Sequence, residues 1–229
     1  VDLASKTLDN EEFNAFVNHI FDRGGIVTSL EFDYTETQFS LDKLKGNLNN
    51  LLSNKNVHVL LEKLPKDEQV HVLGLGFGGS GGLGLGGQAE FMIVFDDKGN
   101  IGQLTSFAGG LIIGKGGTGG LRLLMSKSAD TINDLTDFGF IASGEFGANG
   151  KTGSYSFGIG IPSGKMTHTF GYNFVGKKPF LIFDGSVGAM SGFSFISNSY
   201  NVKNSNYFNQ TIKPIFDILQ TESVKVNFK

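Results

Sequence analysis

Residues 72–96, VLGLGFGGSGGLGLGGQAEFMIVFD, decide the fold class of this chain. Leu73, Leu75 and Phe77 alternate with glycines, and the alternation resumes at residue 83 after a glycine-rich break. A period of two is typical of a β-strand, in which successive side chains point to opposite faces. This stretch is therefore predicted to form strands with one bulky apolar face and one nearly bare face.

The same alternation recurs as far as residue 192, and turn sequences separate the segments. All but three of the chain's 34 glycines lie in this region. The predicted turns contain Gly beside Asp, Asn, Ser or Lys, which is the composition of β-hairpin turns. They fall at residues 96–100, 148–151 and 162–165, and the glycine clusters at 78–82 and 114–120 are expected to break or reverse strands.

The pattern predicts a mainly β fold of about eight to ten strands, joined by short turns in sequence order. We expect an antiparallel meander that closes into a Gly/Phe-rich β-barrel or forms a strongly curved sheet. Apolar residues at helical spacing predict helices on the N- and C-terminal sides, and residues 128–136 read as a loop or short helix. The predicted helices are 6–23, 40–54 and 207–220, the last kinked at Pro214. The expected parts of this one compact domain are 1–66, 67–200 and 201–229.

So much glycine needs a physical explanation. Glycine inside a strand costs roughly 0.5–1 kcal/mol relative to alanine, so if about half of these glycines lie in strands the cost is on the order of 10 kcal/mol. That is comparable to the net stability of a whole domain. Three compensations are possible: tight curvature, a second backbone or helix against the bare face, or lipid on the bulky face with a lumen on the bare one.

Composition excludes several functional classes. The formal net charge is −3 with both signs mixed, so no nucleic-acid partner is expected. The chain has no cysteine, and its four histidines form neither an HxH nor an HExxH pair, so no metal site is expected. The cluster at 114–120 does not match a phosphate-binding loop, because Lys115 stands in the wrong place and a strand follows. No cofactor is expected either.

Acidic residues inside apolar strands are the candidates for catalysis. Glu145 and Asp184 lie in such strands, where a buried carboxylate needs a partner. We expect Glu145 and Asp184 to converge inside a barrel with His168, Glu90 and Arg122. Carboxylates paired with a histidine suit a hydrolase, so His168, Glu145 and Asp184 are the candidate catalytic residues. Interior ion pairs explain the same residues equally well.

Aromatic residues on one strand face are the candidates for ligand binding. His168, Phe170, Tyr172 and Phe174 fall on alternate positions of one segment, and Phe157 belongs to the segment before it. If these faces point inward, Phe157, Phe170, Tyr172 and Phe174 line an apolar interior. A soluble barrel of this kind binds one small apolar ligand.

The sequence also carries a resemblance. The segment GGQAEFMIVFDDKGNIGQLTSFAGG at 86–110, followed by SYSFGIGIP at 154–162, resembles glycine-rich C-terminal β domains of bacterial secreted proteins of the Rhs or polymorphic-toxin type. The resemblance covers about residues 72–175 and transfers no active-site residues. It implies a secreted or exported bacterial effector.

Three functions follow from these observations. The first is a non-enzymatic, toxin-like effector domain that acts at or on a membrane, with lipid or a cognate protein as partner. The alternatives are a soluble barrel that binds an apolar ligand and a hydrolase that uses the interior acids with His168. The direction in which the alternating bulky residues point decides between them. Inward means a packed core or ligand pocket, and outward without cover means lipid or a partner.

Overall fold

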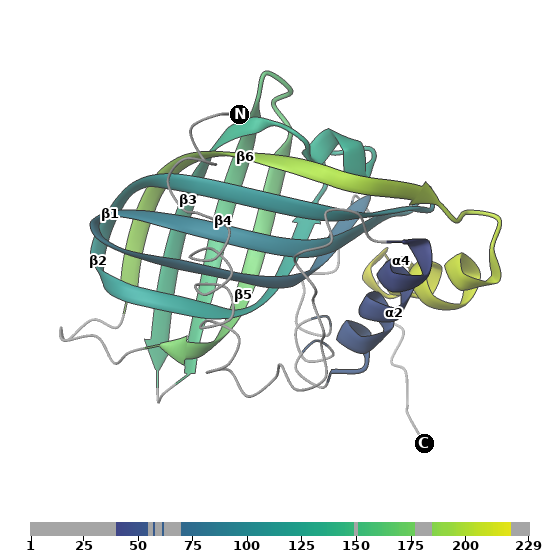
Figure 1. Cartoon of the computed structure of the whole chain (residues 1–229), viewed down its shortest axis with the longest axis horizontal. Coiled ribbons are helices and arrows are strands. Elements are labelled where there is room, and N and C mark those ends of the chain that lie inside the picture. The colour runs from purple at the N-terminus through teal and green to yellow at the C-terminus, as the bar shows by residue number, and fades with distance from the viewer. Residues whose placement is uncertain are drawn as a thin grey trace.

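A computed structural model of the chain describes residues 40–54, 57, 61, 70–148, 151–176 and 185–220. It is mainly β, with six antiparallel strands and short helices outside them (Figure 1). The strands are β1 (Val72–Asp96), β2 (Asn100–Ser126), β3 (Phe138–Ala148), β4 (Lys151–Ile161), β5 (Met166–Gly176) and β6 (Gly185–Asn201). The helical elements are α2 (Leu41–Leu52), the 3₁₀ turn η2 (Ile132–Leu135), the π-helical turn η3 (Phe208–Ile212) and α4 (Lys213–Gln220).

The strands close into the predicted barrel. They follow the order β1-β2-β5-β4-β3-β6, and β2 pairs with β6 as well. The first part of β2 pairs with β6 and its last part with β5, while β1 runs beside β2 along its length. Since β1 and β2 both bend, each supplies two segments to the wall, and the closed barrel counts eight strand segments. Figure 1 shows this bent hairpin in front of β3, β4 and β5.

The predictions for two glycine clusters were wrong. Residues 78–82 were expected to break a strand and 114–120 to turn one, but β1 and β2 each continue through them. The clusters lie opposite each other, with Gly78 paired to Gly120 and Gly82 to Gly116. The two strands therefore bend together without losing the ladder. The register shifts once, beside Gly84, whose φ of 77° favours glycine.

The predicted sequential strand order holds within the β1–β2 hairpin and within the run β3, β4 and β5, but not between these two groups. β6 inserts between β3 and β2, so the barrel is not a simple meander. The cause is the length of the first hairpin, because β2 is long enough for its two halves to pair with different neighbours on one edge. Sequence periodicity specifies which residues form strands but does not specify which strands pair.

Glycine allows the barrel wall to close on itself. The two halves of β1 lie antiparallel beside each other, with Gly76 next to Met92 and Gly78 next to Glu90. A Cβ atom on Gly76 would lie 2.6 Å from the Cα atom of Met92 and would collide with the carbonyl oxygen of Phe91. Any side chain at this position would push the strands apart, so the bare face permits the close approach.

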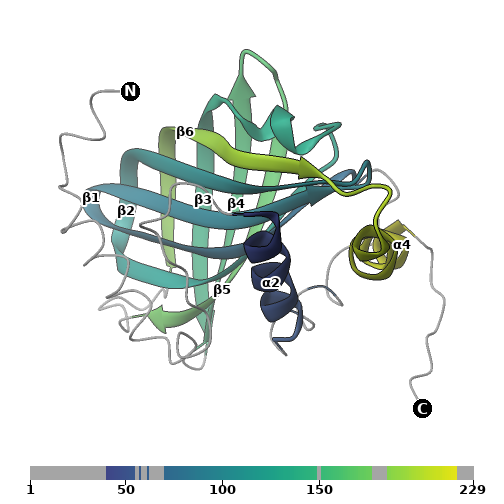
Figure 2. The same cartoon turned by 45° about the vertical axis from the view of Figure 1, so that its right-hand side comes forward.

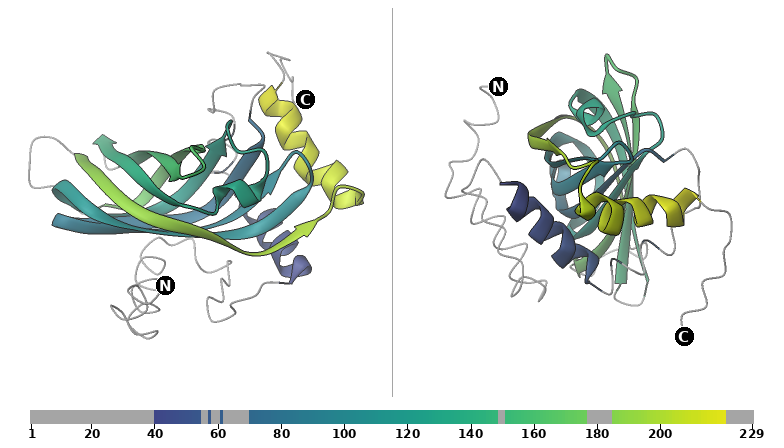
Figure 3. Two further views of the ribbon diagram at one scale, coloured as in Figure 1. Left: turned by 90° about the horizontal axis from the view of Figure 1, so that it is seen from above. Right: turned by 90° about the vertical axis from the view of Figure 1, so that its right-hand side faces the viewer.

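Helices cover one part of the outer wall. α2 and α4 lie near the end of the barrel where β1 begins and β6 ends (Figure 2). Leu44, Leu48 and Leu51 of α2 and Phe216 of α4 share a buried cluster with outward side chains of β1 and β2, among them Leu73. Figure 3 shows both helices at this end from two further directions.

The described helices match their predictions. Ser40 caps α2 by accepting a hydrogen bond from the Lys43 backbone N–H at 3.3 Å, as its position before the apolar repeat predicts. The helical stretch at the C-terminal side includes Pro214, and the predicted short helix after β2 is η2. The predicted helix at 6–23 lies outside the described residues, as does the boundary at residue 66.

Asp96 organises the turn between β1 and β2. Its buried carboxylate accepts hydrogen bonds from the backbone N–H groups of Lys98 (3.1 Å), Asn100 (2.8 Å) and Ile132 (3.0 Å), and from the Asn100 side chain. The residue therefore fixes the hairpin turn and joins it to η2.

Replacing Asp96 with alanine is expected to lower the free energy of unfolding by about 2–4 kcal/mol, because buried donors lose a charged acceptor. Urea denaturation measures the change. Asp217→Ala, which removes an exposed i,i+4 ion pair with Lys213, is the control and should cost about 0.5 kcal/mol. Equal losses in the two variants would contradict the role assigned to Asp96.

Candidate functional site: an uncharged outer belt around a polar interior

The alternation of the strands sorts side chains between the inside and outside of the barrel. Ser156 of β4 is paired with Thr169 of β5, and both line the cavity of the barrel. The adjacent pair, Tyr155 with Phe170, lies on the opposite face of the same strands. On β4 and β5 the small and hydroxyl-bearing residues thus point inward and the bulky apolar residues point outward, whereas β1 and β2 also turn apolar residues such as Met92 and Leu104 inward.

The outward residues form a broad apolar surface, which we call the outer belt. Each member is at least 37% exposed, and the two most exposed, Ile113 and Leu85, reach 79% and 74%. No Asp, Glu, Lys or Arg occupies an outward position among the described side chains of β3–β6. The belt consists of Leu85, Leu111, Ile113, Phe138, Phe140, Tyr155, Ile159, Ile161, Met166, Phe193 and Phe195.

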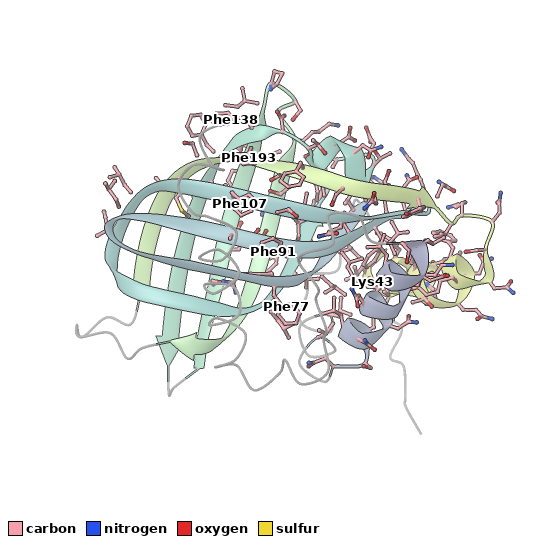
Figure 4. All side chains as sticks on the ribbon, in the orientation of Figure 1. Lys43, Phe77, Phe91, Phe107, Phe138 and Phe193 are labelled. Carbon is pink, nitrogen blue, oxygen red and sulfur yellow. The ribbon has the colours of Figure 1, made fainter. Side chains whose placement is uncertain are left out.

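Phenylalanines cross the strands in a row beside the belt. Figure 4 shows Phe77, Phe91, Phe107, Phe193 and Phe138 following one another across β1, β2, β6 and β3. Phe193 is paired in register with both Phe107 and Phe138, and its ring centroid lies 5.7 Å from that of Phe107. The rings of Phe91 and Phe107 meet edge to face at 5.9 Å. Such cross-strand aromatic pairs fix the register while presenting their rings on the outer side.

The interior is mixed. A cavity of about 70 Å³ lies inside the barrel, and hydroxyl, amide and carboxyl groups line it together with apolar side chains such as Leu104 and Leu124. The Ser106 and Ser194 hydroxyls lie 2.8 Å apart across β2 and β6. A polar cavity of this size has room for water. The polar lining comprises Gln88, Glu90, Ser106, Asp134, Asp137, Ser156, Lys165, Thr167, Thr169 and Ser194.

A buried ion pair stands in this interior. Glu90 of β1 and Arg122 of β2 are both buried, and Arg122 Nε lies 3.8 Å from Glu90 Oε1. The same oxygen accepts a hydrogen bond of 2.7 Å from the Gln88 amide. Burial raises the pKa of the Glu90 carboxyl, and the charge of Arg122 and the Gln88 bond oppose that rise.

The raised pKa of Glu90 makes stability depend on pH. Because the folded protein holds this proton to higher pH than the unfolded chain, stability falls as pH rises from the ordinary value of 4.5 through the raised pKa. Glu90→Gln is expected to remove that slope. Urea denaturation of both proteins from pH 4 to 8 measures it, and parallel pH profiles would contradict the assignment.

His168, a predicted catalytic residue, lies on the outer face, so the prediction that it converges with the interior acids was wrong. It is paired in register with Phe157 and Met125, and its Nδ1 lies 2.8 Å from the Tyr155 hydroxyl. Burial lowers the pKa of its imidazole, and the nearby Lys127 lowers it further. The ring is therefore neutral at physiological pH.

The structure does not describe the side chains of the other two candidate catalytic residues. Asp184 lies outside the described residues. Glu145 belongs to β3, with Ser154 and Ser186 as its register partners, and its side chain is outside the description. Inside the barrel the structure brings together the Glu90 carboxyl and the Arg122 guanidinium, which the sequence suggested only as additional members.

The candidate ligand-binding residues Phe157 and Phe170 also point outward. The Phe157 ring lies 5.2 Å from His168 and the Phe170 ring 5.3 Å from Tyr155. They therefore do not line an interior pocket. The side chains of Tyr172 and Phe174 are outside the description. The signal for the polar interior was present in the sequence, in the Ser, Thr and Gly residues between the aromatic ones.

In comparison with known proteins, the chain matches no family model, no curated protein and no solved structure. In the part of the chain that the structure describes, no His, Asp and Glu residues gather in a group able to hold a metal ion. None of the described helices is both long enough and apolar enough to cross a membrane.

Proposed function

We propose that this protein is a non-enzymatic, toxin-like effector domain that acts at a membrane, with its outer belt in contact with lipid. The observation that carries the proposal is the exposed outer belt: its bulky apolar side chains face outward, while hydroxyl, amide and carboxyl groups share the interior with an apolar cluster. Lipid-facing barrels have this arrangement, since hydrocarbon surrounds them and water or polar groups fill the lumen.

The energetics favour a large apolar partner for the belt. Full burial of a Leu, Ile or Phe side chain stabilises by roughly 1.5–3 kcal/mol, and the belt residues are about half exposed. Covering eleven of them in lipid is therefore worth on the order of 10 kcal/mol. Monomeric proteins in water rarely leave a continuous apolar surface of this kind uncovered.

The strand lengths fit a bilayer as well. β3, β4 and β5 each contain 11 residues. At about 3.3 Å per residue and a tilt of about 45°, such a strand spans roughly 25 Å, close to the apolar band of membrane barrels. Among the described side chains of these strands, the outward positions carry no charge, which is consistent with that depth.

The secreted or exported bacterial setting belongs to the same proposal and rests on the resemblance of residues 86–110 and 154–162. The two alternatives receive less support. An interior apolar ligand would have a cavity of only about 70 Å³ beside the buried Glu90–Arg122 pair, and His168 lies on the face opposite to Ser156 and Thr169. A cognate protein that covers the belt instead of lipid is an outcome that the following experiment detects.

The test is flotation of the purified protein with phosphatidylcholine/phosphatidylglycerol liposomes, combined with release of an entrapped dye at neutral and acidic pH. We expect the protein to float with the vesicles and to release dye under at least one condition. Protein that stays in the dense fraction at both pH values would contradict the proposal. A stable dimer in the same samples would assign the belt to a protein interface.

A further inference from the structure

The segment between β2 and β3 closes one end of the barrel interior. In η2, Ile132 and Leu135 are buried and pack against the inward residues of the wall. These two side chains, together with Ala129, complete an apolar cluster across the barrel mouth. The wall residues of the cluster are Val72, Met92, Val94, Leu104 and Leu124.

Polar contacts hold this segment at the mouth. Asp96 accepts a hydrogen bond from the Ile132 N–H at 3.0 Å, which ties η2 to the β1–β2 turn. On the other side, the Ser128 hydroxyl accepts a hydrogen bond of 2.6 Å from the Met166 backbone N–H. Lys165 Nζ donates a hydrogen bond of 2.6 Å to the Ser128 carbonyl. The segment is thus fastened to two places on the rim and is not part of the strand ladder.

The polar cavity lies directly behind the segment. Its wall includes Asp134 and Leu135 from the segment, and Glu90, Ser106 and Thr169 from the strands. The apolar cluster therefore stands between the mouth and the polar interior. A hydrophobic constriction above a polar lumen is one of the ways in which channels are closed.

We propose that, once the barrel is in a membrane, residues 127–136 act as a plug that closes a polar conduit for small inorganic cations. This inference rests on the proposed function, since a lumen conducts only when lipid surrounds the barrel. A cavity of about 70 Å³ has room for water and small ions.

The charges at the mouth favour cations. Asp134 and Asp137 both line the cavity near the mouth. Hydrogen bonds from Ser163 lower the pKa of the Asp137 carboxyl, which also accepts from the Phe138 N–H, so it is ionised at neutral pH. Lys165 is the cation nearest to them in the lining, and it is engaged by the Ser128 carbonyl and by Asp130. Rings of acidic side chains select cations in pores.

The test compares potassium flux through liposomes carrying the wild-type protein with flux through Ile132→Ala/Leu135→Ala. The variant is expected to bind liposomes as the wild type does and to raise the flux at least tenfold. Leu48→Ala/Leu51→Ala in α2 is the matched control, because it truncates two fully buried side chains outside the lumen. Ser128→Ala, which loosens the fastening without opening the core, is a second variant and should raise the flux to a smaller extent.

Each result bears on the inference. Membrane binding without a difference in flux between the plug variants and the α2 control overturns the plug and leaves the membrane function standing. Equal leakage from the control would show that general destabilisation opens the vesicles, which also overturns it. A reversal potential that follows chloride in a KCl gradient overturns the cation assignment. If no variant binds liposomes, both proposals fail.

Discussion

Replacing Phe140 and Ile113 together with glutamate is expected to reduce liposome binding at least 100-fold while leaving the protein folded. The two side chains lie on different strands of the belt and are 59% and 79% exposed. The variant loses the apolar burial of both side chains in lipid and adds the cost of placing two carboxylates on the lipid face, which together amount to about 3 kcal/mol of binding free energy. Each 1.4 kcal/mol corresponds to a tenfold change in affinity. Because both positions are exposed, stability should change by about 1 kcal/mol or less.

Flotation and urea denaturation of the same samples separate the two effects. Asn204→Glu/Gln210→Glu, which adds the same charge at exposed positions outside the barrel, is the matched control and should bind like the wild type. Equal losses in the two double variants would mean that net charge, and not the belt, governs binding. Unchanged binding of the belt variant would remove the belt as the lipid contact.

Replacing Gly110 with alanine is expected to lower the free energy of unfolding by about 2–3 kcal/mol. Replacing Gly109 with alanine should change this free energy little or raise it. Gly110 is on the inward face, where an added Cβ would lie 2.7 Å from the Cα atom of Met190 and would collide with the Ala189 carbonyl oxygen. At Gly109 the nearest atom would be the Gly86 carbonyl oxygen at 3.7 Å, an ordinary contact.

The two substitutions lie at consecutive positions of one strand. The intrinsic β-propensity is therefore matched, and only the face of the sheet that carries the new side chain differs. Urea denaturation gives the difference directly. Gly192→Ala should behave like Gly110→Ala, because its Cβ would lie 2.6 Å from the Cα atom of Ala108 in the paired strand. Equal stability of the Gly109 and Gly110 variants would show that the strands have room to separate, and that glycine is not needed for the tight wall.

These contacts answer the question that the glycine content raised. Gly76, Gly110 and Gly192 each face a neighbouring strand whose backbone comes too close for a side chain. The cost of glycine in the strands is thus offset by a wall that curves tightly enough to close. At the same time the bare face becomes the interior, which leaves the bulky residues outside.

Local patterns in the sequence determined much of this protein. Alternation identified the strand residues, Asp96 and Gly99 marked the first turn, and Ser40 marked the start of α2, because each depends on neighbours within a few residues. The sorting of side chains into a bulky face and a small face was likewise readable, since it follows from the pleat alone.

Only the tertiary structure decided which face is the inside. A period of two is the same for a barrel with an apolar core and for one with a polar lumen, and closure of the wall breaks that symmetry. Closure also bent β1 and β2 through their glycine clusters, placed β6 beside β2, and buried Glu90 next to Arg122 from residues 32 positions apart. His168 illustrates the same limit. From the sequence we expected it to lie inside the barrel with the acidic residues, but the direction of closure places its side chain outside. Pairing between distant strands and the sign of curvature are collective properties of the whole sheet, so no local pattern specifies them.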